Sequence, residues 1–207
     1  MCDNCLQVPL GFTNDTVPAG THLCLIYSNE EERTDSHLKF LLSGLVNGER
    51  TACFSDALKE ETVRDFFKKN NISYDEQKGK NAVFVSQTND VYFAGGKFDP
   101  DRMINTLTEY YKEAMARGFS AARVIGEMNP RVEKIPGGER LLEYECRVSM
   151  LLKKYPITAV CQYDANAFNG ATIMEILKVH PQMIINGTVV QNPFFIQPEV
   201  YLEELKN

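Results

Sequence analysis

The alternation of strands and helices is clearest in residues 21–55, THLCLIYSNEEERTDSHLKFLLSGLVNGERTACFS. Residues 23–27 are an apolar run of strand length, and a polar stretch over residues 28–36 leads into leucines at helical spacing. After a turn that contains a glycine, residues 51–55 form a second apolar run. This stretch therefore predicts a strand, a loop, a helix and a second strand.

The same alternation continues along the rest of the chain. We expect helices over residues 57–70, 101–117, 139–155 and 170–179, and strands over residues 83–85, 121–127 and 157–163. Asn186-Gly187 separates two short extended segments and is a strong hairpin signal. Strands that alternate with helices predict a three-layer α/β fold, in which helices cover both faces of a mostly parallel sheet and an antiparallel hairpin lies at its C-terminal edge.

The chain has 207 residues, which is long enough for one domain with a sizeable core. Residues 1–20 contain two prolines and two glycines and show little periodicity, which is typical of an arm. We therefore expect a single domain over residues 21–207, preceded by an N-terminal arm over residues 1–20 that lies outside the core.

Composition narrows the class of protein. Hydrophobic residues make up 43% of the chain, yet no apolar segment approaches the roughly 20 residues that span a bilayer, so we expect no membrane partner. The first residues lack the basic start and apolar run of a secretory signal, which predicts a cytoplasmic protein whose six cysteines are thiols. The net charge is −6 and no cluster of lysine and arginine stands out, which argues against direct binding of nucleic acid.

The first loop between strand and helix is where many α/β proteins bind phosphate. Such a loop needs glycines, so that backbone N–H groups can surround the anion, and a lysine for charge. Residues 28–37 contain neither, and they place three glutamates, Glu30 to Glu32, where a triphosphate would lie. These glutamates either repel an anionic ligand or form a solvated helix start that the helix dipole favours. Both readings predict that no nucleotide cofactor is bound.

Several short motifs, in this order along the chain, resemble the MEDS sensory domain of methanogen and methylotroph regulators. They are Gly20-Thr21-His22-Leu23-Cys24, Phe40-Leu41-Leu42-Ser43-Gly44-Leu45, Gly48-Glu49, Gly126-Glu127-Met128, Cys161-Gln162-Tyr163-Asp164, His180-Pro181 and Asn192-Pro193. The resemblance covers most of residues 20–205. It implies a RecA/KaiC-like fold that has lost the phosphate-binding loop, and a role in sensing small hydrocarbon derivatives, often beside a DNA-binding or kinase domain.

On this basis we expect a non-catalytic sensory module that binds a small organic ligand, forms a homodimer and signals to a transcriptional or kinase partner. We expect no enzyme activity, because no nucleophile–base pair or complete metal set is visible. Two alternatives remain open. The fold could serve as a dimerisation scaffold without a ligand, or Cys2 and Cys5 could form a thiol or metal sensor, although a C-x-x-C pair supplies only half of a zinc site.

Four candidate ligand-binding residues lie where strands end. Glu127 ends one strand and Asn129 follows it, whereas Tyr163 and Asp164 end the last main strand. Carboxyl ends of parallel strands meet at one edge of a sheet, where ligands bind. The alternative for Glu127 is a carboxylate on a surface loop. The period of two along a strand also predicts that Tyr163 and Cys161 share one face of the sheet.

Glu145 is the fifth candidate, because it falls within an apolar stripe at helical spacing made by Leu141, Leu142, Val148 and Leu152. A buried carboxylate must be paired or take up a proton. The candidate partners are Arg123, His22 and Tyr163. A structural ion pair and a role in ligand binding both remain open.

Two histidines and one asparagine also stand at the ends of elements. His22 opens the first strand, opposite the expected cleft, which favours a structural role. His180 and Asn192 each precede a proline, which is typical of turns and helix caps. A place at a dimer seam or a lid is the alternative for both.

We expect that the purified protein does not bind Mg-ATP, because the loop after Tyr27 offers negative charge in place of a glycine-rich cradle. Isothermal titration calorimetry checks this expectation. Binding in the micromolar range would contradict it.

Overall fold

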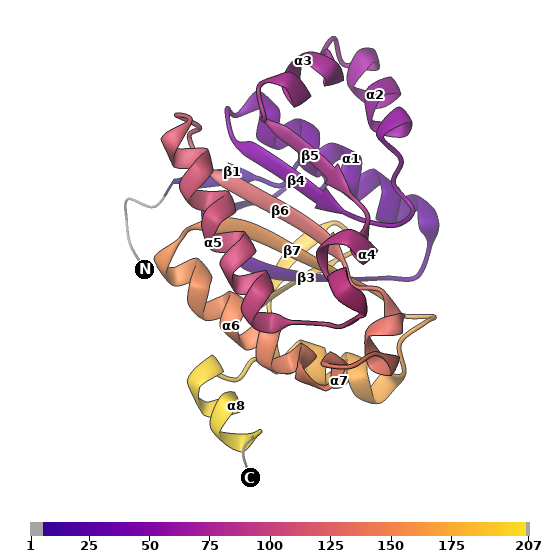
Figure 1. Ribbon diagram of the computed structural model, residues 1–207, viewed down its shortest axis with the longest axis vertical. Helices are drawn as coiled ribbons and strands as arrows, with labels where there is room; N and C mark the ends of the chain where they lie inside the picture. The colour runs from indigo at the N-terminus through magenta and orange to yellow at the C-terminus, as the bar shows by residue number, and fades with distance from the viewer. Residues whose placement is uncertain (1–5, 206–207) are drawn as a thin grey trace.

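A computed structural model describes residues 6–205 of the chain, and its central feature is a seven-stranded sheet (Figure 1). The strands are β3 (His22–Tyr27), β4 (Arg50–Phe54), β5 (Val83–Ser86), β6 (Ala122–Glu127), β7 (Ile157–Asp164), β8 (Gln182–Ile185) and β9 (Thr188–Gln191). Their order is β5-β4-β6-β7-β3-β8-β9, and all neighbours are parallel except β8 and β9. The expected mostly parallel sheet with an antiparallel C-terminal hairpin is confirmed.

Helices cover both faces of this sheet, so the expected three-layer α/β fold is confirmed as well. The α-helices are α1 (Glu30–Val46), α2 (Glu60–Lys69), α3 (Tyr74–Gly79), α4 (Thr88–Val91), α5 (Pro100–Ala116), α6 (Leu141–Lys154), α7 (Gly170–Val179) and α8 (Pro198–Glu204). Three short 3-10 helices are η1 (Ala94–Gly96), η2 (Pro130–Lys134) and η3 (Gly138–Arg140). In Figure 1, α5 and α6 lie in front of the sheet and α1 lies behind it.

Two apolar clusters, one on each face of the sheet, make up most of the core. Met103 of α5 and Val148 of α6 belong to the first cluster, and Phe40 of α1 and Val63 of α2 belong to the second. Adjacent residues of one strand point to opposite clusters, because side chains alternate across a sheet. The central strands are therefore apolar on both sides, as parallel strands covered by helices usually are.

Helix α1 begins at Glu30, earlier than the sequence pattern indicated. Asn29 caps it by accepting a hydrogen bond from the backbone N–H of Glu32, at 2.7 Å. The glutamates of the first turn lie at the positive end of the helix dipole, which favours them there. The stretch expected as a loop over residues 28–36 is therefore mostly the polar first part of the helix.

Part of the expected arm packs into the core. Strands β1 (Gln7–Pro9) and β2 (Thr16–Pro18) form a small antiparallel sheet. Val8, Leu10 and Val17 are buried in the cluster that α1 covers. The expectation that the arm lies outside the core is wrong for these residues, because strands of three residues are too short to show an alternating pattern.

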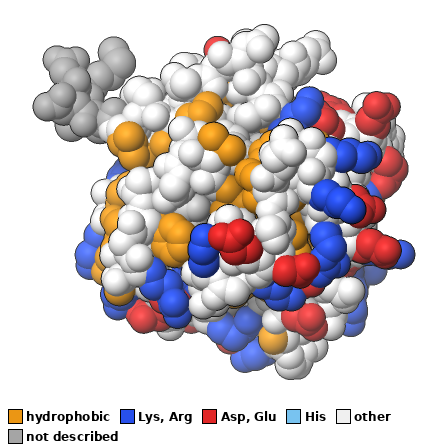
Figure 2. Space-filling model, turned by 90° about the horizontal axis from the view of Figure 1, so that it is seen from above, with side chains coloured by type: hydrophobic (Ala, Val, Ile, Leu, Met, Phe, Trp, Pro, Cys, Tyr) orange, Lys and Arg blue, Asp and Glu red, His pale blue; other side chains and the backbone are white. Residues whose placement is uncertain are grey.

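Two further features are the distribution of charge on the surface and the length of the helices. On the face shown in Figure 2, positive and negative side chains lie intermixed. A nucleic-acid-binding surface typically gathers basic side chains on one face or stripe. Among the described residues, no helix combines the length and the apolar character that crossing a bilayer requires.

Replacing Leu10 by Ala should lower the free energy of unfolding by about 2–5 kcal/mol, because the side chain is fully buried. Leu6 is the matched control: its side chain is 54% exposed, so Leu6→Ala should change stability by less than about 0.5 kcal/mol. Urea unfolding followed by circular dichroism measures both. Equal stability of Leu10→Ala and the wild type would contradict the placement of this segment in the core.

Candidate functional site

Glu127 lies at the carboxyl edge of the sheet and is held by three donors. The hydroxyl of Tyr27 donates to its Oε1 at 3.0 Å, and Nη1 of Arg33 donates to the same oxygen at 3.2 Å. The hydroxyl of Ser55 donates to Oε2 at 2.6 Å. The carboxylate therefore ties β3, α1 and the end of β4 to β6, and it is not simply a surface group.

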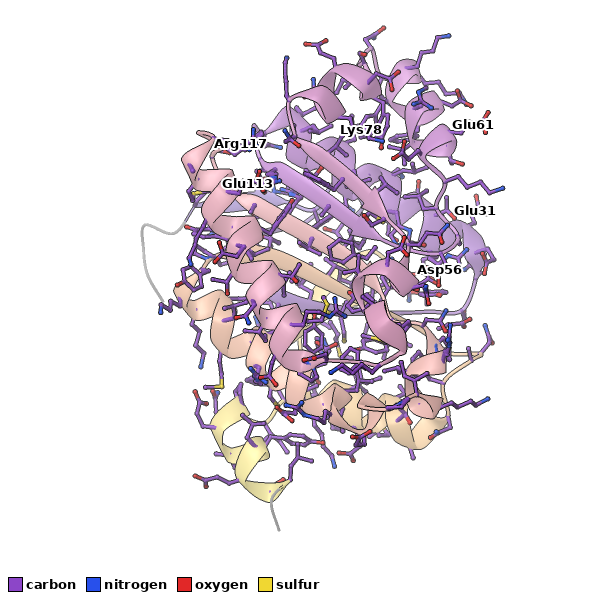
Figure 3. All side chains as sticks on the ribbon, viewed as in Figure 1. Glu31, Asp56, Glu61, Lys78, Glu113 and Arg117 are labelled. Atoms are coloured by element: carbon purple, nitrogen blue, oxygen red, sulfur yellow. The ribbon has the colours of Figure 1, made fainter. Side chains whose placement is uncertain are left out.

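Two of the other three candidates at this edge, Asn129 and Asp164, stabilise local turns. Asn129 donates to Oδ2 of Asp56 at 3.0 Å and accepts a hydrogen bond from the backbone N–H of Arg131, which caps η2. Asp164 accepts a hydrogen bond from the backbone N–H of Asn166 at 2.8 Å. Figure 3 labels Asp56 on the side toward which the strand arrows point. A ligand-binding role for Glu127, Asn129 and Asp164 stays a prediction.

Glu145 is completely buried on the inner face of α6, as its spacing in the sequence indicated. The hydroxyl of Tyr163 donates to its Oε1 at 2.5 Å, and Nε2 of His22 lies 3.3 Å from its Oε2. Arg123 is not a partner, because it points to the opposite face of the sheet and pairs with Glu49. The structure therefore confirms two of the three expected partners.

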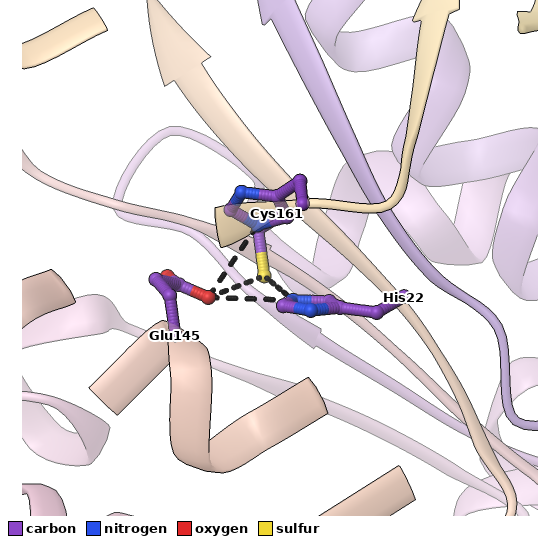
Figure 4. Close-up of side chains that lie close together, drawn as sticks. His22, Glu145 and Cys161 are labelled. Carbon is purple, nitrogen blue, oxygen red and sulfur yellow. Dashed lines mark hydrogen bonds and ion pairs between the residues drawn. The ribbon is translucent and has the colours of Figure 1, made fainter. Parts of the chain in front are cut away.

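Three side chains converge at Oε2 of Glu145. Nε2 of His180 lies 3.4 Å from this oxygen and the thiol of Cys161 lies 3.5 Å from it, while 3.4 Å separates the thiol from Nε2 of His22. The donor atoms of His22, Glu145, Cys161 and His180 all lie within 4.8 Å of one another. Figure 4 shows how Glu145, Cys161 and His22 point toward one another. We call the four residues His22, Glu145, Cys161 and His180 the buried cluster.

The topology brings these residues together from four elements. Strand β3 lies between β7 and β8, so His22, at the start of β3, has Cys161 of β7 on one side. His180 lies on the other side, between α7 and β8. Helix α6 packs over this face and supplies Glu145. The strand order of the sheet is what places His180 here, and no signal within the sequence alone revealed it.

Hydrogen bonds outside the buried cluster fix the orientation of both imidazoles. Nδ1 of His180 donates to the carbonyl oxygen of Ile176 at 2.8 Å. The hydroxyl of Ser149 donates to the carbonyl oxygen of Val179, so it accepts a hydrogen bond from Nδ1 of His22 at 2.7 Å. With the Nδ1 protons directed outward, both Nε2 atoms point inward at the carboxylate.

Burial also shifts the acid–base behaviour of the cluster. Burial, together with the neighbouring His180, lowers the pKa of His22 to about 4, although Glu145 opposes this shift. Burial, with the nearby Glu145 carboxylate, raises the pKa of the Cys161 thiol well above its ordinary value. Burial opposes the charge on Glu145, but the neighbouring imidazoles of His180 and His22 hold its pKa below the usual range.

A cavity of about 310 Å³ adjoins the buried cluster at His22. Its walls come from the start of β3, from α6, from β8 and β9, and from the segment that follows β9. The lining residues are Gly20, Thr21, His22, Ser149, Lys153, Pro181, Gln182, Gln191, Phe195, Gln197 and Pro198. Cys161 also keeps some accessible surface, although the other three members of the cluster are buried.

A second cavity, of about 800 Å³, lies between the loop after β6 and helix α7. It is closer to the cleft expected at the carboxyl ends of the strands, but its lining contains none of the five candidate residues.

The Cys2/Cys5 pair lies outside the described residues. Asn192 donates to the carbonyl oxygens of Leu177 and His180 and accepts from the backbone N–H of Phe194, which confirms the expected cap chemistry.

Comparison with known proteins identifies the family. The family model described as "MEthanogen/methylotroph, DcmR Sensory domain", or MEDS, matches residues 21–181. The chain belongs to the MEDS family. This MEDS chain is 26% identical over 160 residues to the transcriptional repressor DcmR of Methylorubrum extorquens, a match that covers 77% of the chain and 57% of the repressor. The chain therefore spans little more than half the length of that relative.

Two solved structures show the fold of this MEDS domain. One is a KaiC-like protein of Pyrococcus horikoshii, with a TM-score of 0.60, 12% identity, and coverage of 87% of this chain and 80% of that protein. The other is the flagellar accessory protein FlaH of Methanocaldococcus jannaschii, with a TM-score of 0.61, 11% identity, and coverage of 90% and 84%. The MEDS domain therefore has a KaiC-like fold.

Replacing Glu145 by Ala should lower the free energy of unfolding by about 1–3 kcal/mol, because the hydroxyl of Tyr163 would lose its acceptor inside the core. Glu143 is the control on the same helix. Its ion pairs with Arg140 and Arg147 are partly exposed, so Glu143→Ala should cost no more than about 1 kcal/mol. Chemical denaturation compares the two, and equal losses would refute the special position of Glu145.

Proposed function

We propose that this MEDS domain is a non-catalytic sensory module that binds a small organic ligand in the cavity beside His22 and signals to a regulator of transcription. One observation carries the proposal. His22 lines the cavity and is also a member of the buried cluster, so a ligand in the cavity would touch a side chain that reaches into the core.

The cavity has the chemistry that a small organic molecule requires. Phe195, Pro181 and Pro198 offer apolar surface, while Thr21 and Ser149 offer hydroxyl groups. Binding sites of this kind are mostly apolar, with a few polar groups that orient the ligand. A volume of about 310 Å³ is at the small end of such sites, which favours a short hydrocarbon derivative.

The features of the first helix argue against a nucleotide as the ligand. The N-terminus of α1 is capped by Asn29, and its first turn carries three glutamates. Arg33, the nearby cation, is already paired with Glu30 and Glu127. A triphosphate would have to displace these contacts and would meet negative charge.

A route for the signal follows from the walls of the cavity. Phe195 and Gln197 belong to the segment between β9 and α8, and α8 packs against α6. A ligand that binds one arrangement of this segment more tightly than another shifts the population toward it. Several apolar side chains on or near this segment are exposed and could contact a regulatory partner or a second copy of the chain: Phe194, Val200 and Leu205.

Filling the cavity tests the proposal. Short-chain alcohols, amines and haloalkanes are screened by thermal shift, and a ligand at about 100 times its Kd should add about 2.7 kcal/mol of stability. Gln191→Trp should abolish this stabilisation, because the exposed side chain of Gln191 lies at the cavity wall. Met174→Trp, which fills the second cavity, is the control and should leave it intact.

Three results would contradict the proposal. Loss of stabilisation in Met174→Trp alone would place the ligand in the cavity beside α7. Equal stabilisation of the wild type and Gln191→Trp would exclude the cavity beside His22. A wild type that responds to no compound and forms a stable dimer would favour the dimerisation scaffold.

A further inference from the structure

The buried cluster contains a polar atom that lacks a hydrogen bond. Nε2 of His180 is fully buried and has no hydrogen-bond partner among residues 6–205. Because Nδ1 of the same ring donates to the carbonyl oxygen of Ile176, the neutral ring presents a lone pair at Nε2. This lone pair points toward Oε2 of Glu145, at 3.4 Å, and that oxygen also offers lone pairs. Two acceptors that face each other inside a core are satisfied when a proton or a metal ion lies between them.

The spacing of the donor atoms fits a tetrahedral metal ion. Bonds of about 2.0–2.3 Å from a zinc-like ion place neighbouring ligand atoms about 3.3–3.8 Å apart. Four pairs in the buried cluster have distances of 3.3, 3.4, 3.4 and 3.5 Å, and all donor atoms lie within 4.8 Å of one another. The site therefore needs little rearrangement to hold an ion.

Outer contacts orient three of the four donors, as is usual around bound metals. Ser149 and the carbonyl oxygen of Ile176 bond to the Nδ1 atoms of the two imidazoles and direct Nε2 inward. The hydroxyl of Tyr163 bonds to Oε1 of Glu145, which leaves Oε2 for the ion. A hydrogen-bonded carboxylate of this kind can bind a metal through one oxygen.

Charge balance points the same way. A carboxylate and a thiolate carry two negative charges, and the two neutral imidazoles add none. An isolated charge in a protein core is costly, and a divalent cation would make the whole site neutral. The mixture of nitrogen, sulfur and oxygen donors suits zinc and its neighbours, whereas magnesium and calcium prefer oxygen alone.

We propose that His22, Glu145, Cys161 and His180 bind one divalent transition metal ion of the zinc class. These four residues include neither Cys2 nor Cys5. This metal site goes beyond the proposed sensory function and does not depend on it, because the ion would be held inside the core whether or not a ligand occupies the cavity beside His22.

Titration of the reduced, metal-free full chain with Co²⁺ tests the site, because Co²⁺ in a tetrahedral thiolate site absorbs light where Zn²⁺ does not. The wild type should bind one equivalent, with visible d–d bands and a thiolate-to-cobalt charge-transfer band in the near ultraviolet. Zn²⁺ should displace the Co²⁺ and abolish both bands, and Mg²⁺ should not.

Variants locate the ligands. Cys161→Ser should abolish the charge-transfer band, and His180→Gln should weaken Co²⁺ binding by at least about 100-fold, since loss of an outer contact alone costs 10–100-fold. Cys53→Ala is the control, because Cys53 is a buried strand cysteine in the cluster that α1 covers. A double variant of Cys2→Ser and Cys5→Ser is the second control. Both controls should bind like the wild type.

The outcomes that would overturn the proposal are equally specific. The proposal is overturned if the wild type shows no thiolate-to-cobalt band after addition of Co²⁺. It is also overturned if the Cys161→Ser variant keeps this band. Loss of the band in the Cys2/Cys5 variant would assign the metal to the N-terminal pair. If His180→Gln fails to fold, as circular dichroism would show, the bands of Cys161→Ser and of the two controls decide.

Discussion

Glu145 brings a carboxylate to the inner face of α6, where the side chain is fully covered. A charge in such a place destabilises the fold unless polar groups surround it. The hydroxyl of Tyr163 donates to this carboxylate, Nε2 of His22 lies 3.3 Å from it and Nε2 of His180 lies 3.4 Å from it, and the three groups come from different parts of the chain. Helix α6, strands β3 and β7 and the turn before β8 are therefore tied together by one side chain.

The same requirement explains why the polar groups gather on this side of the sheet. On the opposite face, Arg123 is also fully buried, and it is satisfied by Glu49 and by the carbonyl oxygens of Pro9 and Phe40. Each face thus carries its own buried charged group with its own partners. The sheet separates the two sets, so the networks are formed independently.

The sequence predicts most of the fold because the main elements are long and strongly patterned. Strands such as β3 and β7 and helices such as α5 are recognisable from apolar runs and helical spacing. Short elements were not predicted, among them β1, β2, α3 and α8, because a few residues carry no periodic signal. The apolar pattern alone places the start of α1 too late, because the first turns of this helix are polar.

The site is only partly predictable for a different reason. Periodicity placed Glu145 in the core, and alternation along β7 placed Tyr163 and Cys161 on one face. The face toward which Arg123 points was not foreseen, nor was the position of His180 beside β3. Both depend on the order of strands in the sheet, and local patterns do not determine that order.

Asn192 couples the C-terminal segment to the buried cluster. Its amide group bonds to the carbonyl oxygens of Leu177 and His180, and its own oxygen accepts from the backbone N–H of Phe194. Any displacement of the chain after β9 would therefore pull on the backbone of His180 and change the distance from its ring to Glu145. The tail of the domain and the geometry at its centre are mechanically linked through this amide side chain and through the backbone hydrogen bonds from Asn192 to Pro181 and from Ile196 to Lys178.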